Sequence, residues 1–187
     1  MARMRGLSWS LIAPAVVISA PAPALAVDYL TPEQAQSRMF PAAASFETRE
    51  VALTPEQQGD LAQRLGSPLP RGSWTLRLAR GPGGLLGVVV VDEVVGKFER
   101  ITYAVALGPD AVIHDVEVLS YRESHGQEIM LPAWRRQFTG KNAAAPLQVG
   151  KDIASISGAT LSCTHVTQGV RRIAALVEAL RSAGELR

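Results

Sequence analysis

The segment Ile156-Ser157-Gly158-Ala159-Thr160-Leu161-Ser162 contains residue types that could bind a phosphate group. Ser157, Gly158 and Ala159 are small, so a bulky group could approach the backbone, and glycine adopts backbone angles that other residues avoid. The segment leads into a predicted helix, whose first amide N–H groups are unpaired and carry a partial positive charge. Such a helix end can bind phosphate without lysine or arginine. The alternative is an ordinary helix cap, which serine and threonine often supply.

The stretch Ser157–Ser162 also resembles the flavin-attachment motif of the FMN-binding domain family. This family includes the C subunit of the sodium-pumping NADH:quinone reductase and the G subunit of the Rnf electron-transport complex. Its Ser-Gly-Ala-Thr threonine carries FMN as a phosphoester, made from FAD by an exported flavin transferase, so the resemblance implies covalent FMN on Thr160. It also implies that the cofactor is bound by Ser157, Gly158, Ala159, Leu161 and Ser162.

Two further segments match the family in the same order. The segment from Tyr121 to Glu128 resembles the family's Glu-Thr-Pro-Gly segment, which lies against the flavin. The resemblance therefore implies cofactor contacts from Glu123, Ser124 and Gly126. Phe138-Thr139-Gly140-Lys141 resembles the phenylalanine and glycine-lysine pair found shortly before the acceptor loop. The resemblance extends over roughly residues 73 to 180.

One position departs from the family motif. The family usually has Asp three residues before the motif serine, and Ala154 occupies that place here. The nearest acidic residue is Asp152, two positions further back. If the transferase needs a carboxylate at this position, attachment to this chain is slow, or FMN is bound without the covalent link.

The middle of the chain predicts β-strands. Trp74, Leu76 and Leu78 alternate with less apolar residues, which is the period of a half-buried strand. Residues 85–91 are a continuous valine-rich run, as expected for a strand covered on both faces. Residues 98–107 and 111–121 flank Gly108-Pro109-Asp110, which predicts a turn and therefore a hairpin.

Helices are predicted on both sides of these strands. Thr31-Pro32-Glu33 and Thr54-Pro55-Glu56 are each typical of a helix start. A short amphipathic helix is predicted over 129–138, and a long one with a single apolar stripe over about 162–182. The fold class is therefore α+β, an antiparallel sheet with the long C-terminal helix packed on it, similar to an FMN-binding domain.

Residues 1–26 are predicted to be a signal peptide. Arg3 and Arg5 precede an apolar run that ends in the small-x-small site Ala24-Leu25-Ala26. A retained membrane anchor is the alternative, although three prolines within the run disfavour a spanning helix. We then expect an N-terminal extension with short helices over 27–72, an FMN-binding domain over 73–187, and a periplasmic location.

Charge and cysteine content exclude some functions. The net charge of +2 falls to about zero once Arg3 and Arg5 are removed, which does not suit nucleic-acid binding. Cys163 is the one cysteine of the sequence, so no internal disulfide can form. Together with His125 and His165 it gives only a weak metal pattern.

Three other features of the sequence are not assigned a catalytic role. Residues 81–87 contain four glycines, but their spacing does not fit a dinucleotide loop and a turn between strands is preferred. A serine hydrolase is conceivable at Ser157, although Gly-x-Ser-x-Gly is absent from the sequence. Arg135 and Arg136 are interpreted as a solvated helix face.

These observations favour an exported flavoprotein that carries FMN and relays electrons between redox partners, including a membrane electron-transfer complex. We expect a carrier more than a stand-alone enzyme, because no acid–base pair can be identified from the sequence. Two alternatives stay open. One is a periplasmic flavin-dependent reductase of a small acceptor, and the other is a flavin-free binding or scaffold domain that has kept the fold.

Overall fold

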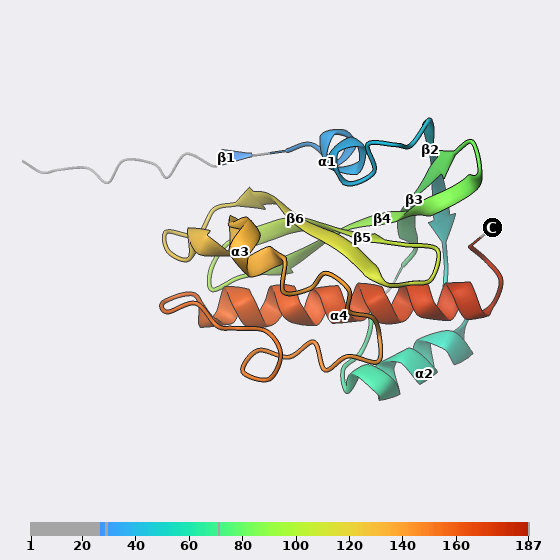
Figure 1. The fold of residues 1–187 in the computed structure, drawn as a ribbon. Helices are drawn as coiled ribbons and strands as arrows, with labels where there is room; N and C mark the ends of the chain where they lie inside the picture. The colour runs from blue at the N-terminus through green and yellow to red at the C-terminus, as the bar shows by residue number, and fades with distance from the viewer. Residues whose placement is uncertain (1–26, 29, 71, 187) are drawn as a thin grey trace, which may run out of the picture.

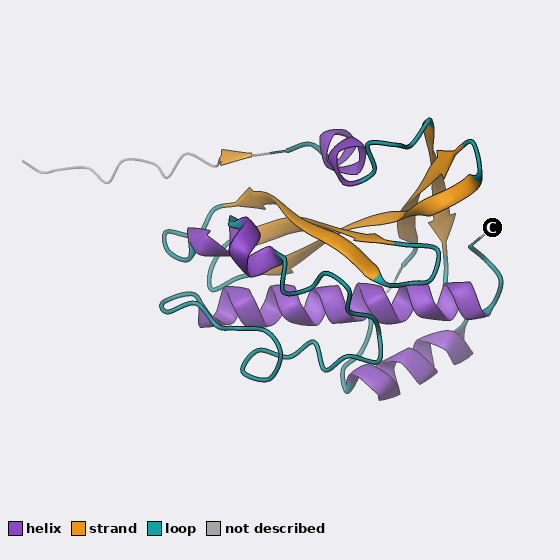
Figure 2. Ribbon diagram, viewed as in Figure 1, coloured by secondary structure: helices purple, strands orange, loops and turns teal. Residues whose placement is uncertain are grey.

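The computed structural model describes residues 27–28, 30–70 and 72–186, so the predicted signal peptide lies outside the described residues. Within these ranges the strands form a six-stranded sheet in the order β1-β6-β5-β4-β3-β2, and every neighbouring pair is antiparallel (Figure 1). The strands are β1 (Val27–Asp28), β2 (Ser45–Val51), β3 (Trp74–Gly81), β4 (Gly84–Val95), β5 (Arg100–Leu107) and β6 (Ile113–Tyr121). The predicted α+β class is confirmed, with helices on both faces of this sheet (Figure 2).

Tight turns connect the central strands as the sequence predicts. Gly81 pairs with Gly84 across the β3–β4 turn, so the glycine-rich segment joins two strands and does not precede a helix. Gly108 N–H donates to the Val112 carbonyl at 2.9 Å, closing the predicted β5–β6 hairpin. These turns place β3 beside β4 and β5 beside β6, and β4 pairs with β5 in the middle of the sheet.

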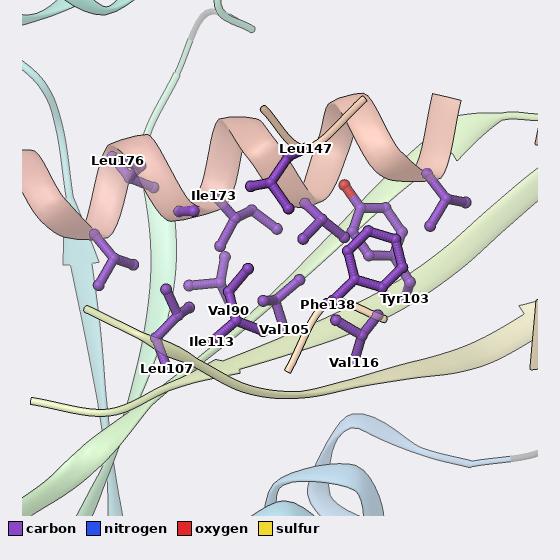
Figure 3. Close-up of a cluster of buried hydrophobic side chains, with 14 of the residues drawn as sticks. Val90, Tyr103, Val105, Leu107, Ile113, Val116, Phe138, Leu147, Ile173 and Leu176 are labelled. Atoms are coloured by element: carbon purple, nitrogen blue, oxygen red, sulfur yellow. The ribbon is translucent and has the colours of Figure 1, made fainter. Parts of the chain in front are cut away.

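Helix α4 (Thr160–Ser182) covers one face of the sheet and forms the main core with it. Its apolar stripe is buried along its whole length, and its side chains pack among those of β4, β5 and β6 (Figure 3). At Gly169 the helix comes so close to the sheet that an added Cβ would lie 1.9 Å from the Tyr103 hydroxyl. Each fully buried aliphatic side chain contributes about 1.5–3 kcal/mol to folding, so this face holds α4 on the sheet.

The remaining helices cover the outer layers. Helix α1 (Pro32–Met39) lies on the opposite face of the sheet from α4, where Met39 and Phe40 pack against small residues of the strands. Helix α2 (Pro55–Leu65) packs against α4. No helix in the described ranges is both long and apolar enough to cross a bilayer.

The helix predicted over 129–138 is wrong in detail. The structure has a 3₁₀ turn η1 (Gln127–Met130) and a short helix α3 (Pro132–Arg135). Leu131 separates them in an extended conformation, with φ −68° and ψ 138°. The physical reason is Pro132, because the residue before a proline is disfavoured in the α region.

The prediction of a solvated face at Arg135 is also wrong. Its side chain is buried, with Nη1 2.9 Å from Glu117 Oε1 and Nε donating to the Met130 carbonyl at 2.9 Å. Arg135 thus ties α3 to β6, and its charge is neutralised by a buried carboxylate. The sequence pattern did not reveal this pairing because the two residues come from different elements.

Candidate functional site

A pocket of about 360 Å³ opens where three chain segments meet at the N-terminus of α4. This volume lies within the range of about 300–1,000 Å³ that is usual for small-molecule and cofactor sites. One wall is the turn between β4 and β5, and a second is the segment that follows β6. The lining residues are Lys97, Phe98, Glu123, Ser124, His125, Gly158, Ala159, Thr160, Leu161 and Ser162.

The N-terminus of α4 has no side-chain cap. Its N-cap residue is Ala159, and the first helical hydrogen bond runs from Cys163 N–H to the Ala159 carbonyl at 2.9 Å. In the described part of the chain, no acceptor is found for the N–H groups of Thr160, Leu161 and Ser162. The alternative of an ordinary serine or threonine cap is therefore wrong. Three amide donors with a partial positive charge lie at the pocket.

Thr160 is the first residue of the helix, and its side chain is exposed. Gly158, two residues earlier, has φ +79° with open space around it, which is a conformation that favours glycine. Cys163 is buried, and this burial raises the pKa of its thiol. The exposed hydroxyl of Thr160 is therefore the accessible nucleophilic oxygen at the start of the helix.

The second wall packs directly against this helix start. Gly126 has φ +87°, and an added Cβ there would lie 2.2 Å from the Ala159 Cβ. Tyr121 Oη donates to the His125 carbonyl at 2.5 Å and lies 3.5 Å from Ser162 Oγ. The two segments singled out in the sequence, residues 121–128 and 156–162, are thus in contact.

Glu123 is bound to the backbone of the β4–β5 turn. Its Oε1 accepts hydrogen bonds from the N–H groups of Phe98 at 2.7 Å and Glu99 at 3.0 Å. Burial acts to raise the pKa of Glu123, but the N–H donors of the turn and the nearby Lys97 charge outweigh it, so the pKa is lowered. Its carboxylate is therefore anionic and hydrogen-bonded to the turn through Oε1. Glu123 also lines the pocket, and its contact with the cofactor stays a prediction.

The turn contributes two lining residues that the sequence analysis did not identify. Phe98 is 75% exposed, and the Lys97 Nζ lies 4.9 Å from the centre of its ring. The sequence analysis placed Phe98 at the start of a strand, but β5 begins at Arg100. The available signal was the sequence Gly96-Lys97-Phe98 between two strands, where a large aromatic residue has no core to enter.

The loop before the acceptor segment is held by Asp152. Its carboxylate accepts from the N–H groups of Gln148 at 2.8 Å and Leu147 at 3.2 Å, and lies 3.1 Å from the Lys141 Nζ. Burial acts to raise the pKa of Asp152, and the Gln148 N–H and the Lys141 charge lower it below its usual value. Asp152 thus stabilises the loop and is not a free replacement for an acid at position 154.

Ala154 itself is exposed, and its backbone is bound on both sides. Its N–H donates to Gln137 Oε1 and its carbonyl accepts from Trp134 Nε1, both at 2.8 Å. A side chain at this position therefore projects from a fixed backbone at the protein surface.

Most of the residues singled out in the sequence meet at the pocket. Gly126 does not line it but supports the wall behind Ala159, and Ser157 is exposed outside the lining. His125 lines the pocket, with its Nδ1 2.9 Å from Ser124 Oγ. His165 lies further along α4, where its Nδ1 is 2.6 Å from the Val95 carbonyl.

Comparisons with known proteins give two partial likenesses. The acetyl esterase of Salmonella paratyphi B is 29% identical over 124 residues, which are 60% of this chain and 38% of the esterase. The chain therefore spans about two fifths of that relative. The C subunit of the Na⁺-translocating NADH-quinone reductase from Parabacteroides distasonis has 13% identity and a TM-score of 0.48, with 84% of each chain covered.

The model of the FMN-binding domain family matches residues 96–175. The match begins at the β4–β5 turn and continues through the segment after β6 and into α4, so it includes all three walls of the pocket. Residues 96–175 therefore match the FMN-binding domain family, and this match supports FMN as the cofactor.

Proposed function

We propose that this chain is an exported electron carrier whose FMN is linked through its phosphate to Thr160. The observation that carries the proposal is the exposed Thr160 hydroxyl at the uncapped start of α4, inside the pocket of an FMN-binding domain. When bound, FMN would supply both one- and two-electron transfer at a single group. Export rests on the signal-peptide pattern of residues 1–26.

The residues at the helix start fit a phosphate group. The free N–H groups of Thr160, Leu161 and Ser162 would bind its oxygens, and the open space at Gly158 leaves room for it. In the attachment step, the Thr160 oxygen would bond to the phosphorus of the FMN half of FAD, and the pyrophosphate P–O bond to AMP would break, so that AMP leaves. The proton of the hydroxyl passes to a base of the flavin transferase.

The pocket supports a carrier more than a hydrolase. Glu123, the one carboxylate among its described lining residues, is held by the β4–β5 turn. Ser124 and His125 lie 2.9 Å apart, but they are sequence neighbours on an exposed segment, and in the described residues no carboxylate orients the histidine. The sequence also lacks Gly-x-Ser-x-Gly. The likeness to an acetyl esterase therefore does not lead us to propose esterase activity.

The intact mass of the exported protein tests the attachment. We expect the parent chain, produced together with a flavin transferase, to gain the mass of one FMN less one water. Thr160→Ala should lack this gain, whereas Thr54→Ala, at the start of α2, should retain it. An unmodified parent chain, or a modified Thr160→Ala variant, would contradict the proposed linkage.

Reoxidation of the reduced protein distinguishes a carrier from a reductase. A carrier should transfer its electrons to an oxidised redox protein and be reoxidised by small acceptors without saturation. A rate that saturates with the concentration of a small acceptor would instead favour the periplasmic reductase.

A further inference from the structure

The turn Gly96–Glu99 faces the start of α4 across the pocket. We propose that this turn contacts the flavin ring, with Phe98 covering the ring, Lys97 placing a positive charge beside it, and Glu123 acting as the positioning residue that holds the turn. This inference rests on the proposed function. Lys97 and Phe98 lie outside the three motif segments that resemble the FMN-binding domain family, and Glu123 lies within one of them.

The backbone of the turn is fixed from two sides. Glu123 Oε1 accepts from the N–H groups of Phe98 and Glu99, and the Gly96 N–H donates to the Glu99 carbonyl at 2.8 Å. A Cβ added at Gly96 would lie 2.5 Å from Glu123 Oε1 and 3.1 Å from Ser162 Oγ. The turn therefore rests directly on the carboxylate and on the first turn of α4.

The side chains of the turn are left exposed by this fixed backbone. Phe98 is 75% exposed and Leu161, at the start of α4, is 47% exposed, and both line the same pocket. Single exposed apolar residues need no explanation, but two that line one pocket offer cover to a flat aromatic group. A ring held between them would bury apolar surface that the protein alone leaves in water.

Lys97 places a positive charge on this wall, close to the anionic Glu123 carboxylate. In the described part of the chain it forms no salt bridge, and the Glu123 carboxylate below it is hydrogen-bonded to the turn. A cation beside a cofactor favours the form that carries more negative charge. Lys97 would therefore raise the reduction potential of the bound FMN, because reduction adds electrons to the ring.

The reduction potential tests the role of Lys97 in the full-length FMN-loaded protein. We expect Lys97→Gln to shift the midpoint potential to more negative values, with a larger shift at low than at high ionic strength. Lys151→Gln is the matched control, since Lys151 is exposed in another loop and does not line the pocket. Equal potentials in the parent and Lys97→Gln would overturn the electrostatic role.

Quenching of flavin fluorescence by iodide tests the cover supplied by Phe98. We expect Phe98→Ala to increase quenching, because the ring becomes accessible to the anion. Leu131→Ala removes an apolar side chain that is 52% exposed but lies outside the pocket, and it should leave quenching unchanged. Unchanged quenching in Phe98→Ala would show that the ring lies elsewhere.

Glu123→Gln tests the positioning role, and its first measurement needs no flavin. In protein produced without a transferase, the amides of Phe98 and Glu99 should exchange their hydrogens faster than in the parent. With FMN attached, the same variant should show the stronger quenching of Phe98→Ala. Unchanged exchange would overturn the role of Glu123.

The outcomes separate this proposal from the proposed function. A parent chain that never acquires flavin contradicts both. If the parent acquires flavin but Lys97→Gln does not change its potential and Phe98→Ala does not change its quenching, only the proposed contact between the turn and the flavin ring is contradicted. If Glu123→Gln does not fold, Lys97→Gln and Phe98→Ala still test whether the turn contacts the flavin ring.

Discussion

The starts of α1 and α2 differ from the start of α4 in how their first amides are satisfied. Thr31 and Thr54 each accept a hydrogen bond from the N–H group of the glutamine three residues later, at 3.2 Å. Each glutamine in turn accepts from the threonine N–H, at 2.9 and 2.8 Å. Helix α4 has Thr160 and Ser162 in its first turn, yet its N-cap is Ala159 and no side chain caps it.

This difference shows which helix can do without a cap. Helices α1 and α2 have 8 and 11 residues, and isolated helices of that length are marginal in water. Helix α4 has 23 residues with a buried stripe along its length, so packing holds it. A missing cap costs about 1 kcal/mol, which α4 can tolerate while its N–H groups stay available to a ligand.

Filling the space next to Ala159, at the uncapped start of α4, should cause the largest loss of stability. Gly126→Ala places a Cβ 2.2 Å from the Ala159 Cβ in a conformation that favours glycine. Overpacking costs about 1–3 kcal/mol and the positive φ about 1 kcal/mol. We therefore expect denaturant unfolding to show a loss of about 2–4 kcal/mol, together with reduced FMN attachment.

Gly140→Ala is the matched control for this variant. Gly140 has φ +79°, but an added Cβ meets no atom within 4 Å. It should cost about 1 kcal/mol from backbone strain alone. If both variants lost the same stability, the contact between Gly126 and Ala159 would not matter to the site.

Removing threonine at each kind of helix start should give opposite results. Thr54→Ala removes a capping box and should lower the free energy of unfolding by about 1 kcal/mol, with FMN still attached. In flavin-free protein, Thr160→Ala should leave stability nearly unchanged, because Thr160 caps nothing. Thermal unfolding followed by circular dichroism measures both, and a large loss in Thr160→Ala would show a structural role for its hydroxyl.

A smaller effect is expected from pH through Glu123. Its pKa is lowered in the folded protein, so its carboxylate stabilises the fold above the unfolded pKa of about 4.3. This stabilisation is lost as the pH falls through the lower folded pKa. The free energy of unfolding of the parent should therefore decrease more steeply below about pH 5 than that of Glu123→Gln. Parallel curves would contradict this contribution.

The smallest effect on stability is expected at position 154. Ala154 is exposed on a backbone that Gln137 and Trp134 hold, so Ala154→Asp should leave unfolding within about 0.5 kcal/mol. If the transferase needs an acid there, the variant should acquire FMN faster in a time course of intact mass. Asp152 is engaged by the loop and cannot take this place. Equal rates would show that the motif works without the acid.

The periodic parts of the fold could be predicted from the sequence because burial imposes their pattern. The valine run 85–91 is covered on both faces within β4, as expected. The Gly108-Pro109-Asp110 turn closes the β5–β6 hairpin, and the predicted long helix agrees with α4 to within two residues at its start. Both threonine-proline helix starts are confirmed.

The parts that could not be predicted depend on contacts between distant residues. Arg135 and Glu117 form a buried pair because α3 packs on β6, which no local pattern reveals. Glu123 binds the backbone of a turn about 25 residues earlier, so its role is set by the register of β4, β5 and β6. For the same reason, the position of the strands determines that Lys97 and Phe98 line the pocket.

The three walls of the pocket are joined only in the folded chain, since they come from residues 97–98, 123–125 and 158–162. A ligand that binds only the folded state stabilises it by mass action, in proportion to the logarithm of its free concentration. FMN held reversibly would therefore protect this protein only while free FMN is abundant. FMN tethered at the first residue of α4 would instead keep a constant local concentration at the pocket, independent of how dilute its surroundings become.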